Sequence, residues 1–341
     1  MNGTFMVSLD FELFWGMLEV VSQESYRDNV LGGKKAIGQL LQLFETYGIH
    51  ATWATVGFLF ADNYEELAPF FPENRPSYEN PELNYYANFE KIGSSEETAP
   101  CFYAPGLLER IAKTPGQEIG SHTFCHYYCR EAGQTVEQFE ADMEAAKAIA
   151  KAKGYDVTSV ILPRNQSEPE YTEVLRKLGF TAYRAEEDDW IHRNFRKKKW
   201  QAPFRALHLL DMYLPLTGRC CYAPRFEDGI CNLVGSRIFR PIFRPLEFLE
   251  GLKLRRIKGE MRYAAKHGLV YHLWWHPHNL GVRTEENLAQ LEELFRYYTE
   301  LKEQYGMQSL NMGEAAEAAA LTRKNIAEKN GLQNKNTSEE I

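Results

Sequence analysis

Hydrophobic and amphipathic stretches alternate along most of the chain. Short apolar runs rich in β-branched and aromatic residues predict buried strands, at residues 4–11, 50–60, 118–126, 157–166, 180–190 and 269–281. Apolar residues at helical spacing predict helices between them, at residues 34–48, 104–113, 135–154, 168–179, 245–268 and 284–306. This repeated strand–helix order predicts an α/β fold with a parallel sheet.

The chemically capable side chains gather where the predicted strands end. They are Asp10, Glu12, His122, His126, Arg164, Asp189 and His276. Parallel α/β barrels place their sites at the carboxyl ends of the strands, and open doubly wound sheets follow the same rule. No GxGxxG sequence supports a dinucleotide-binding version of the open sheet. We therefore expect one site at this edge of a distorted (β/α) barrel, with barrel closure as an inference.

Two long stretches lack a clear periodicity. Residues 61–104 and 191–244 are rich in aromatic and polar residues, and such insertions in a compact domain are usually functional loops. We expect both to form a cap over the strand ends of a single domain spanning residues 1–322. Residues 323–341 are polar and predict a flexible tail.

Composition narrows the functional classes. The net charge of −8 disfavours a nucleic-acid binder, and the aromatic share of 13% suits platforms for flat ligands such as sugars. The chain shows neither a signal-peptide pattern nor an apolar run of 18 residues, so we expect a cytoplasmic protein with six reduced cysteines. The basic stretch from Arg193 to Lys199 is a candidate contact with anionic lipid head groups or a pyrophosphate-linked donor, and the alternative is an ordinary solvated face. The sequence leaves the oligomeric state open.

The pair His122 and His126 is the first candidate for metal binding. Two histidines with a carboxylate suit a borderline divalent ion such as zinc, with open positions for water. Several alternatives remain at this point. The histidines could be ordinary core residues, or a local site could add Cys125 and Cys129. His276 could equally be a core histidine, Arg164 a surface ion pair, and residues 186–189 a solvated acidic turn.

The order of the motifs resembles the polysaccharide deacetylase family, whose shared unit is the nodulation-type chitooligosaccharide deacetylase homology domain. The matching stretches are SLDFE (8–12), ATWATVG (51–57), SHTFCH (121–126), LPRNQ (162–166), DDW (188–190) and LWWHP (273–277). The family implies a distorted barrel of about seven parallel strands, a divalent metal and hydrolysis of an N-acetyl group.

The resemblance also implies roles for individual residues. Asp10 would be the catalytic base and His276 the acid, with Arg164 bracing the base and Asp189 orienting the acid. The implied metal ligands are Glu12, His122 and His126, and the implied walls of the acetyl pocket are Trp190 and Trp275. Zinc is the first choice of metal, and cobalt, nickel, manganese and iron are compatible with these ligands.

The chain departs from the family pattern at two motifs. The usual pair of adjacent aspartates is interrupted by Phe11, and PRNQ reverses the usual Arg-x-Pro order. Side chains alternate along a strand, so Asp10 and Glu12 should share a face with Phe11 on the other. We expect the longer Glu12 to bind the metal and Asp10 to act as base. The alternative is the reverse assignment.

The expected activity is metal-dependent removal of an N-acetyl group from an acetamido sugar of a surface polysaccharide or its precursor. Two alternatives remain. One is a hydrolase of small cyclic amides, similar to allantoinase, and the other is a non-catalytic carbohydrate-binding relative.

Overall fold

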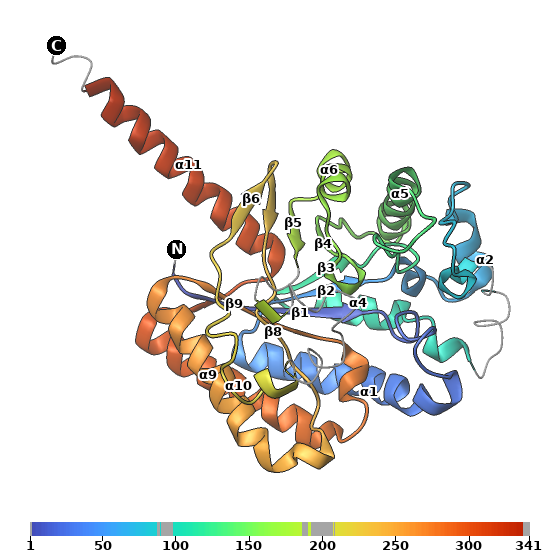
Figure 1. Ribbon diagram of the computed structural model, residues 1–341, viewed down its shortest axis with the longest axis horizontal. Helices are drawn as coiled ribbons and strands as arrows, with labels where there is room; N and C mark the ends of the chain where they lie inside the picture. Colours follow the sequence, from blue (N-terminus) through green and yellow to red (C-terminus); the bar gives the residue numbers. More distant parts are fainter. Residues whose placement is uncertain are drawn as a thin grey trace.

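A mostly parallel sheet forms the centre of the protein (Figure 1). The computed structural model describes residues 2–86, 89, 98–185, 190–191, 207 and 209–336. Within these residues the sheet has ten strands, in the order β6-β7-β5-β4-β3-β2-β1-β9-β8, with β10 beside β1. The main parallel strands are β1 (Thr4–Phe11), β2 (Ala51–Thr55), β3 (Gln117–Ser121), β4 (Ser159–Ile161), β5 (Ala182–Arg184) and β9 (Val270–Trp275).

Helices cover the outer face of this sheet. The longer ones that follow the strands are α1 (Gln23–Tyr47), α4 (Pro105–Lys113), α5 (Val136–Ala152), α6 (Pro169–Lys177), α9 (Glu250–His267) and α10 (Thr284–Tyr305). Figure 1 shows α1, α9 and α10 together on one side of β1 and β9. None of the described helices has the length and hydropathy needed to cross a membrane.

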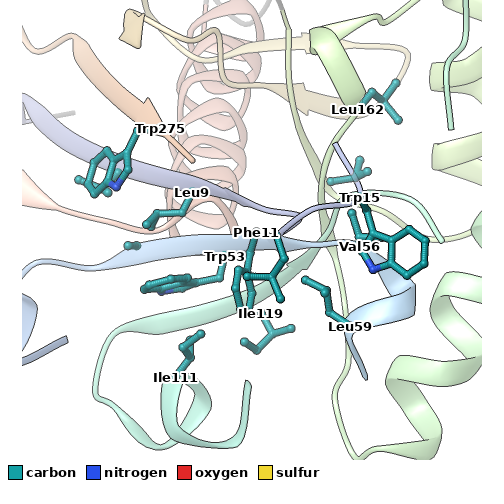
Figure 2. Close-up of a cluster of buried hydrophobic side chains, with 14 of the residues drawn as sticks. Leu9, Phe11, Trp15, Trp53, Val56, Leu59, Ile111, Ile119, Leu162 and Trp275 are labelled. Carbon is teal, nitrogen blue, oxygen red and sulfur yellow. The ribbon is translucent and has the colours of Figure 1, made fainter. Parts of the chain in front are cut away.

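Side chains of β1 alternate between the hydrophobic core on its outer face and the polar site on its inner face. Leu9 and Phe11 point outward, and Phe11 meets Trp53 of β2 edge-on at 5.9 Å between ring centroids (Figure 2). Burial of this aromatic layer contributes roughly 25 cal/mol for each Å² of apolar surface removed from water. Asp10 lies between these two residues and therefore points to the opposite, inner face.

The predicted fold class is confirmed as a distorted α/β half-barrel surrounded by helices. The segment 230–239 spans its two ends. Its first part, β7 (Ile230–Asn232), pairs with β5, and its last part, β8 (Arg237–Ile238), pairs with β9. Between them, Gly235 donates its N–H to Ala185 O and Ser236 donates its N–H to His272 O.

The second predicted insertion is more ordered than its sequence indicated. Residues 225–238 contain three strands, where we expected irregular structure. The first, β6 (Arg225–Glu227), forms an antiparallel hairpin with β7 through Asp228 and Gly229, which both have positive φ. Asp-Gly is the preferred sequence for such a two-residue turn, so the signal was present in the sequence. The basic stretch from Arg193 to Lys199 and the predicted acid-orienting Asp189 lie outside the described residues.

The other insertion and the C-terminus also contain helical structure. Residues 61–104 include the short helix α2 (Tyr64–Leu67). The chain returns to the sheet through β10 (Gln308–Ser309) and then forms α11 (Met312–Asn336). Met312, Ala315 and Ala319 are buried in a cluster with inner-face residues of the strands. The helix continues to Asn336 and projects from the sheet, where we expected a polar tail from residue 323 (Figure 1).

Candidate active site

The inner faces of the strands bring polar residues together at one end of the sheet. Ser8 and Asp10 point inward from β1, and Glu12 follows directly after that strand. The same alternation along and beyond β9 aligns His272 and His276 with this face. The register pairs Ser8 with Trp274 in the neighbouring strand, so these side chains lie side by side.

Glu12, His122 and His126 form a buried cluster suited to a metal ion. Their ligand atoms all lie within 4.8 Å of one another. Glu12 Oε2 is 3.3 Å from His122 Nε2 and 3.0 Å from His126 Nε2. Burial by itself would raise the pKa of the Glu12 carboxyl, but the charge of His276 and the contacts with the His122 and His126 rings outweigh it. That pKa lies well below its usual value, so Glu12 is a carboxylate.

The hydrogen bonding of His122 fits a cation at this position. Its Nδ1 lies 2.7 Å from the carbonyl oxygen of Ile161, which fixes Nδ1 as the donor. In a neutral imidazole the lone pair of Nε2 then faces the Glu12 carboxylate, and two acceptors face each other. A divalent ion between them satisfies both. The donor set, one carboxylate and two imidazoles, leaves coordination positions for water and substrate.

The absence of a side chain at Gly16 leaves space for the Glu12 carboxyl. A Cβ placed on Gly16 would lie 2.1 Å from Cδ of Glu12. Any other residue at this position therefore forces the Glu12 carboxyl to move. The chain turns back sharply here, with Leu13 at φ 51°, so that Gly16 lies against the carboxyl.

The loop that carries the histidines is strained and is held by buried polar contacts. Thr123 and His126 have φ of 65° and 60°, a region that side chains other than glycine rarely adopt. Asp142 of α5 accepts hydrogen bonds from the N–H groups of Phe124 at 2.7 Å and Cys125 at 3.1 Å. Sequence reasoning missed Asp142, although a buried acid on the apolar face of a predicted helix was a usable signal.

Asp10 is tied to Arg184, which the sequence analysis did not select. Arg184 Nη2 donates to Asp10 Oδ2 at 2.7 Å, and its other nitrogens donate to Ser8 Oγ and Asn165 Oδ1, each at 2.8 Å. Burial raises the pKa of the Asp10 carboxyl, but the positive charges of Arg184, His122 and His276 outweigh it and lower that pKa below its usual value. In the sequence, the indication of a role for Arg184 was its position as a charged residue inside an otherwise apolar strand.

The predicted contact between Arg164 and Asp10 is corrected by the structure. Arg164 has a 44% exposed side chain and pairs with Glu19 at 2.9 Å and Glu131 at 2.7 Å. Its guanidinium also lies over the ring of Tyr128 at 4.3 Å. The φ of 56° at Arg164 turns its side chain away from the interior. The next residue of the PRNQ motif, Asn165, is buried and reaches Arg184 instead.

His276 stands at the mouth of the site beside both carboxylates. Its Nε2 is 3.5 Å from Glu12 Oε1 and 3.7 Å from Asp10 Oδ2. The side chain is 23% exposed, compared with 1% for His122, so it can meet a substrate that enters from solvent. Its ring stacks on that of His278 at 5.1 Å between centroids.

Of the two tryptophans predicted to line the acetyl pocket, Trp275 lies away from the site. Trp275 is fully buried on the outer face of β9, against Phe44 and Phe239, because it is out of phase with His276. Trp274 takes the inner position and contacts the His276 ring at 5.8 Å between centroids. Trp190 is 43% exposed and donates to the backbone carbonyl of Leu216.

Comparisons with known proteins agree with the fold. The polysaccharide deacetylase family model matches residues 28–183, which include His122, His126 and Arg164. Asp10 and Glu12 precede the matched residues, and His276 follows them. No curated protein sequence matches the chain.

Solved structures extend the likeness to nearly the whole chain. A putative polysaccharide deacetylase from Mycobacterium smegmatis is 14% identical, with a TM-score of 0.59 over 95% of this chain and 92% of that one. A probable polysaccharide deacetylase from Pseudomonas aeruginosa PAO1 and PuuE allantoinase are each 12% identical to this chain. Each has a TM-score of 0.53 over 92% of this chain and 89% of its own. Residues 28–183 of this chain therefore match the polysaccharide deacetylase family model, within a fold that the solved structures share along most of its length.

Proposed function

We propose that the protein is a metal-dependent deacetylase that hydrolyses the N-acetyl group of an acetamido sugar in a surface glycan or its precursor. The observation that carries this proposal is the position of Asp10 and His276 beside the cluster of Glu12, His122 and His126. Metal-assisted hydrolysis of an acyl bond requires metal ligands, a base and an acid close together, and these residues provide them.

The proposed metal ligands are Glu12, His122 and His126, with zinc as the first candidate ion. A bound divalent ion would polarise the acetyl carbonyl and lower the pKa of water at the site. The Ile161 carbonyl holds the His122 ring so that Nε2 faces the site. Asp142 stabilises the strained loop that sets the position of His126.

Asp10 is the proposed general base. Arg184, Ser8 and Asn165 hold its carboxylate in place from the buried side. The lowered pKa keeps Asp10 ionised near neutral pH, so it can accept a proton from the attacking water.

His276 is the proposed general acid. It lies close to both carboxylates and is the most exposed of the site histidines, so it can deliver a proton to the departing amine. Trp274 packs against its ring and limits its orientation. The proton lost by water and the proton gained by the amine balance over one turnover, and acetate and the free amino sugar are released.

The match to the polysaccharide deacetylase family model supports an acetamido sugar as the substrate class. Two tyrosines position one of the proposed metal ligands. Tyr85 and Tyr128 flank His126, with ring centroids at 6.4 and 4.9 Å. Both hydroxyls donate to Glu19 at 2.6 Å and both rings are buried, so they hold the His126 ring in place. Tyr85 belongs to the segment 61–104, so this contact supports a role for that segment in shaping the site.

Release of acetate from N-acetylhexosamine oligomers tests the proposal. We expect acetate release that is lost after chelation and restored by a divalent ion, and a much lower rate for the glycan after substitution of His122 by Ala. The fold likeness to PuuE allantoinase makes allantoin the matched second substrate. Turnover of allantoin without acetate release would replace the proposal with cyclic-amide hydrolysis. Sugar binding without turnover of either substrate would indicate a carbohydrate-binding protein.

A further inference from the structure

Exposed hydrophobic side chains are concentrated on one part of the molecule. Among the described residues, eleven large hydrophobic side chains are exposed, and seven of these lie between residues 190 and 252. They are Trp190, Leu210, Leu214, Leu216, Phe243, Phe248 and Leu252. Scattered single residues of this kind are normal on a protein surface, but a concentration of them indicates an interaction site.

Two adjoining hollows show that several of these residues share a surface. One hollow of about 420 Å³ is lined by Leu209, Ile242 and Phe243, among others. The other, of about 390 Å³, is lined by Leu214 and Leu252. Both hollows include Tyr213, so they are neighbours on the surface. We call this the 210–256 surface, after the segment that provides most of it.

Phe248 has the most exposed aromatic side chain among the described residues, and in the sequence it lies between Phe243 of the first hollow and Leu252 of the second. Phe248 is 80% exposed and belongs to a short helical segment, Arg244–Leu249, that leads into α9. Phe243 precedes this segment and is 50% exposed. Both rings are exposed to solvent and therefore contribute little to the hydrophobic core.

The charge around these side chains is positive, in contrast to the chain as a whole. Residues 237–256 contain six basic and two acidic residues, whereas the whole chain has a net charge of −8. Three of the basic residues, Arg237, Lys253 and Arg256, are largely buried in ion pairs with acids, so the positive charge that faces solvent comes from other arginines. Arg219, Arg244 and Arg255 are exposed at this surface. One of the two acids, Glu247, pairs with Arg283 at 2.7 Å, so its charge is compensated.

We propose that the 210–256 surface docks the protein on an anionic lipid bilayer. Aromatic and leucine side chains enter the boundary between head groups and acyl chains, while arginines meet the anionic head groups. A second copy of this chain fits the charges less well, because a two-fold interface would bring the same positive patch of both copies together.

The position of this surface relative to the site suits a membrane-borne substrate. Asn279 lines the first hollow, and its N–H donates to the carbonyl oxygen of His276 at 3.0 Å. The docked face therefore adjoins the side of the site that carries His276. This part of the inference rests on the proposed function, whereas the docking itself does not.

Co-sedimentation of the full chain with vesicles tests the docking. We expect binding to vesicles of phosphatidylcholine mixed with phosphatidylglycerol, and weak binding to phosphatidylcholine alone. The double variant Phe243→Ser/Phe248→Ser should bind the mixed vesicles at least about tenfold more weakly, because two aromatic rings no longer enter the lipid. Arg244→Glu/Arg255→Glu should remove the preference for phosphatidylglycerol. Leu321→Ser, which is 61% exposed on α11, is the matched control and should bind like the wild type.

Three outcomes would overturn the inference. They are equal binding to both vesicle types, retention of binding by the phenylalanine variant, and a wild type that stays in the supernatant. Sedimentation velocity then decides whether Phe248→Ser dissociates a dimer, which would assign the surface to a second copy. Acetate release from a small soluble substrate should be unchanged in the phenylalanine variant. Because sedimentation needs no turnover, a failure of docking is distinguishable from a failure of the proposed activity.

Discussion

Arg184 reaches across the inner face of the sheet and binds Asp10, with 2.7 Å between Nη2 and Oδ2 and both side chains buried. Asp10 lies on β1 and Arg184 on β5, with three strands between them in the order β5-β4-β3-β2-β1. A buried ion pair of this kind is costly to desolvate, and breaking it leaves an uncompensated charge. The pair therefore fixes where the Asp10 carboxylate sits and keeps it ionised.

Substitution of Arg184 should impair catalysis through Asp10. In Arg184→Lys the charge remains, but one ammonium cannot reproduce the contacts with Ser8, Asn165 and Asp10. We expect kcat to fall by roughly 10–100-fold with the metal still bound. The acid limb of the pH profile of kcat/KM should move to higher pH, because Asp10 loses stabilisation of its charged form. Arg164→Lys is the matched control, and an equal loss in both variants would contradict this role for Arg184.

Asp10 and Glu12 should respond differently to removal of their charges. Glu12→Gln removes a proposed ligand, and we expect metal affinity to fall by more than the roughly 10–100-fold typical of an outer partner. Asp10→Asn should retain the metal and lose turnover, because Asn accepts no proton from water. Metal content after dialysis and acetate release separate the two effects. A metal-free Asp10→Asn protein with a metal-loaded Glu12→Gln protein would reverse the roles.

Gly16 offers a test of Glu12 that removes no ligand. The new methyl group of Gly16→Ala would lie 2.1 Å from Glu12 Cδ, so the carboxyl must move away from the histidines. We expect weaker metal binding in a folded protein, measured by competition with a chelating dye. Gly251→Ala is the control, since nothing lies within 4 Å of a Cβ placed there. Wild-type metal affinity in Gly16→Ala would show that Glu12 is not a ligand.

His276→Ala should separate acid catalysis from metal binding. If His276 protonates the amine, kcat should fall by roughly 10²–10⁴-fold while the metal stays bound. A substrate with a better leaving group should lose less activity in this variant, because its departure needs less help from an acid. His267→Ala, at an exposed position of α9, should leave kcat unchanged. An unchanged kcat in His276→Ala removes it from the mechanism.

Stability should fall in acid because of the buried histidine His272. Burial, and then the charge of Arg184, lower its pKa to about 3 in the folded protein. The unfolded chain takes up a proton near pH 6.5 that the folded state binds only near pH 3, so stability falls as the pH drops through this window. The loss is about 1.4 kcal/mol for each pH unit below the unfolded pKa. Asp142 acts in the opposite direction, since burial raises its pKa to about 6.

Comparison of the wild type with His272→Gln isolates this contribution. The free energy of unfolding should be measured by urea titration between pH 4.5 and 7 in buffers at about equal ionic strength. We expect the advantage of the wild type to shrink steadily as the pH falls. Parallel curves for the two proteins would show that His272 does not titrate between the folded and unfolded states.

Much of the fold and part of the site follow from local patterns in the sequence. Alternation along β1 places Asp10 and Glu12 on one face and Phe11 on the other, and the structure has this arrangement. The spacing of His122 and His126 in one loop brings them within 5.1 Å between ring centroids. These features depend on neighbours in the chain, so one sequence suffices to predict them.

The sequence also determines which side chains of β9 point inward. His276 lies two residues after Trp274 and one after Trp275, so an inward His276 requires an inward Trp274. The structure buries Trp275 on the outer face as this phase demands. Once His276 is placed on the inner face, the sequence alone therefore determines that Trp274, and not Trp275, lines the site.

The partner of Asp10 was decided by tertiary structure alone. Arg164 and Arg184 both follow or lie within predicted strands, and each is a chemically adequate partner for a carboxylate. The positive φ at Arg164 and the inward phase of Arg184 select between them. The same holds for Asp142, which binds a loop 17 and 18 residues away. Local sequence fixes which face of its own strand or helix a side chain occupies, but the curvature and order of the strands decide which distant side chain it meets.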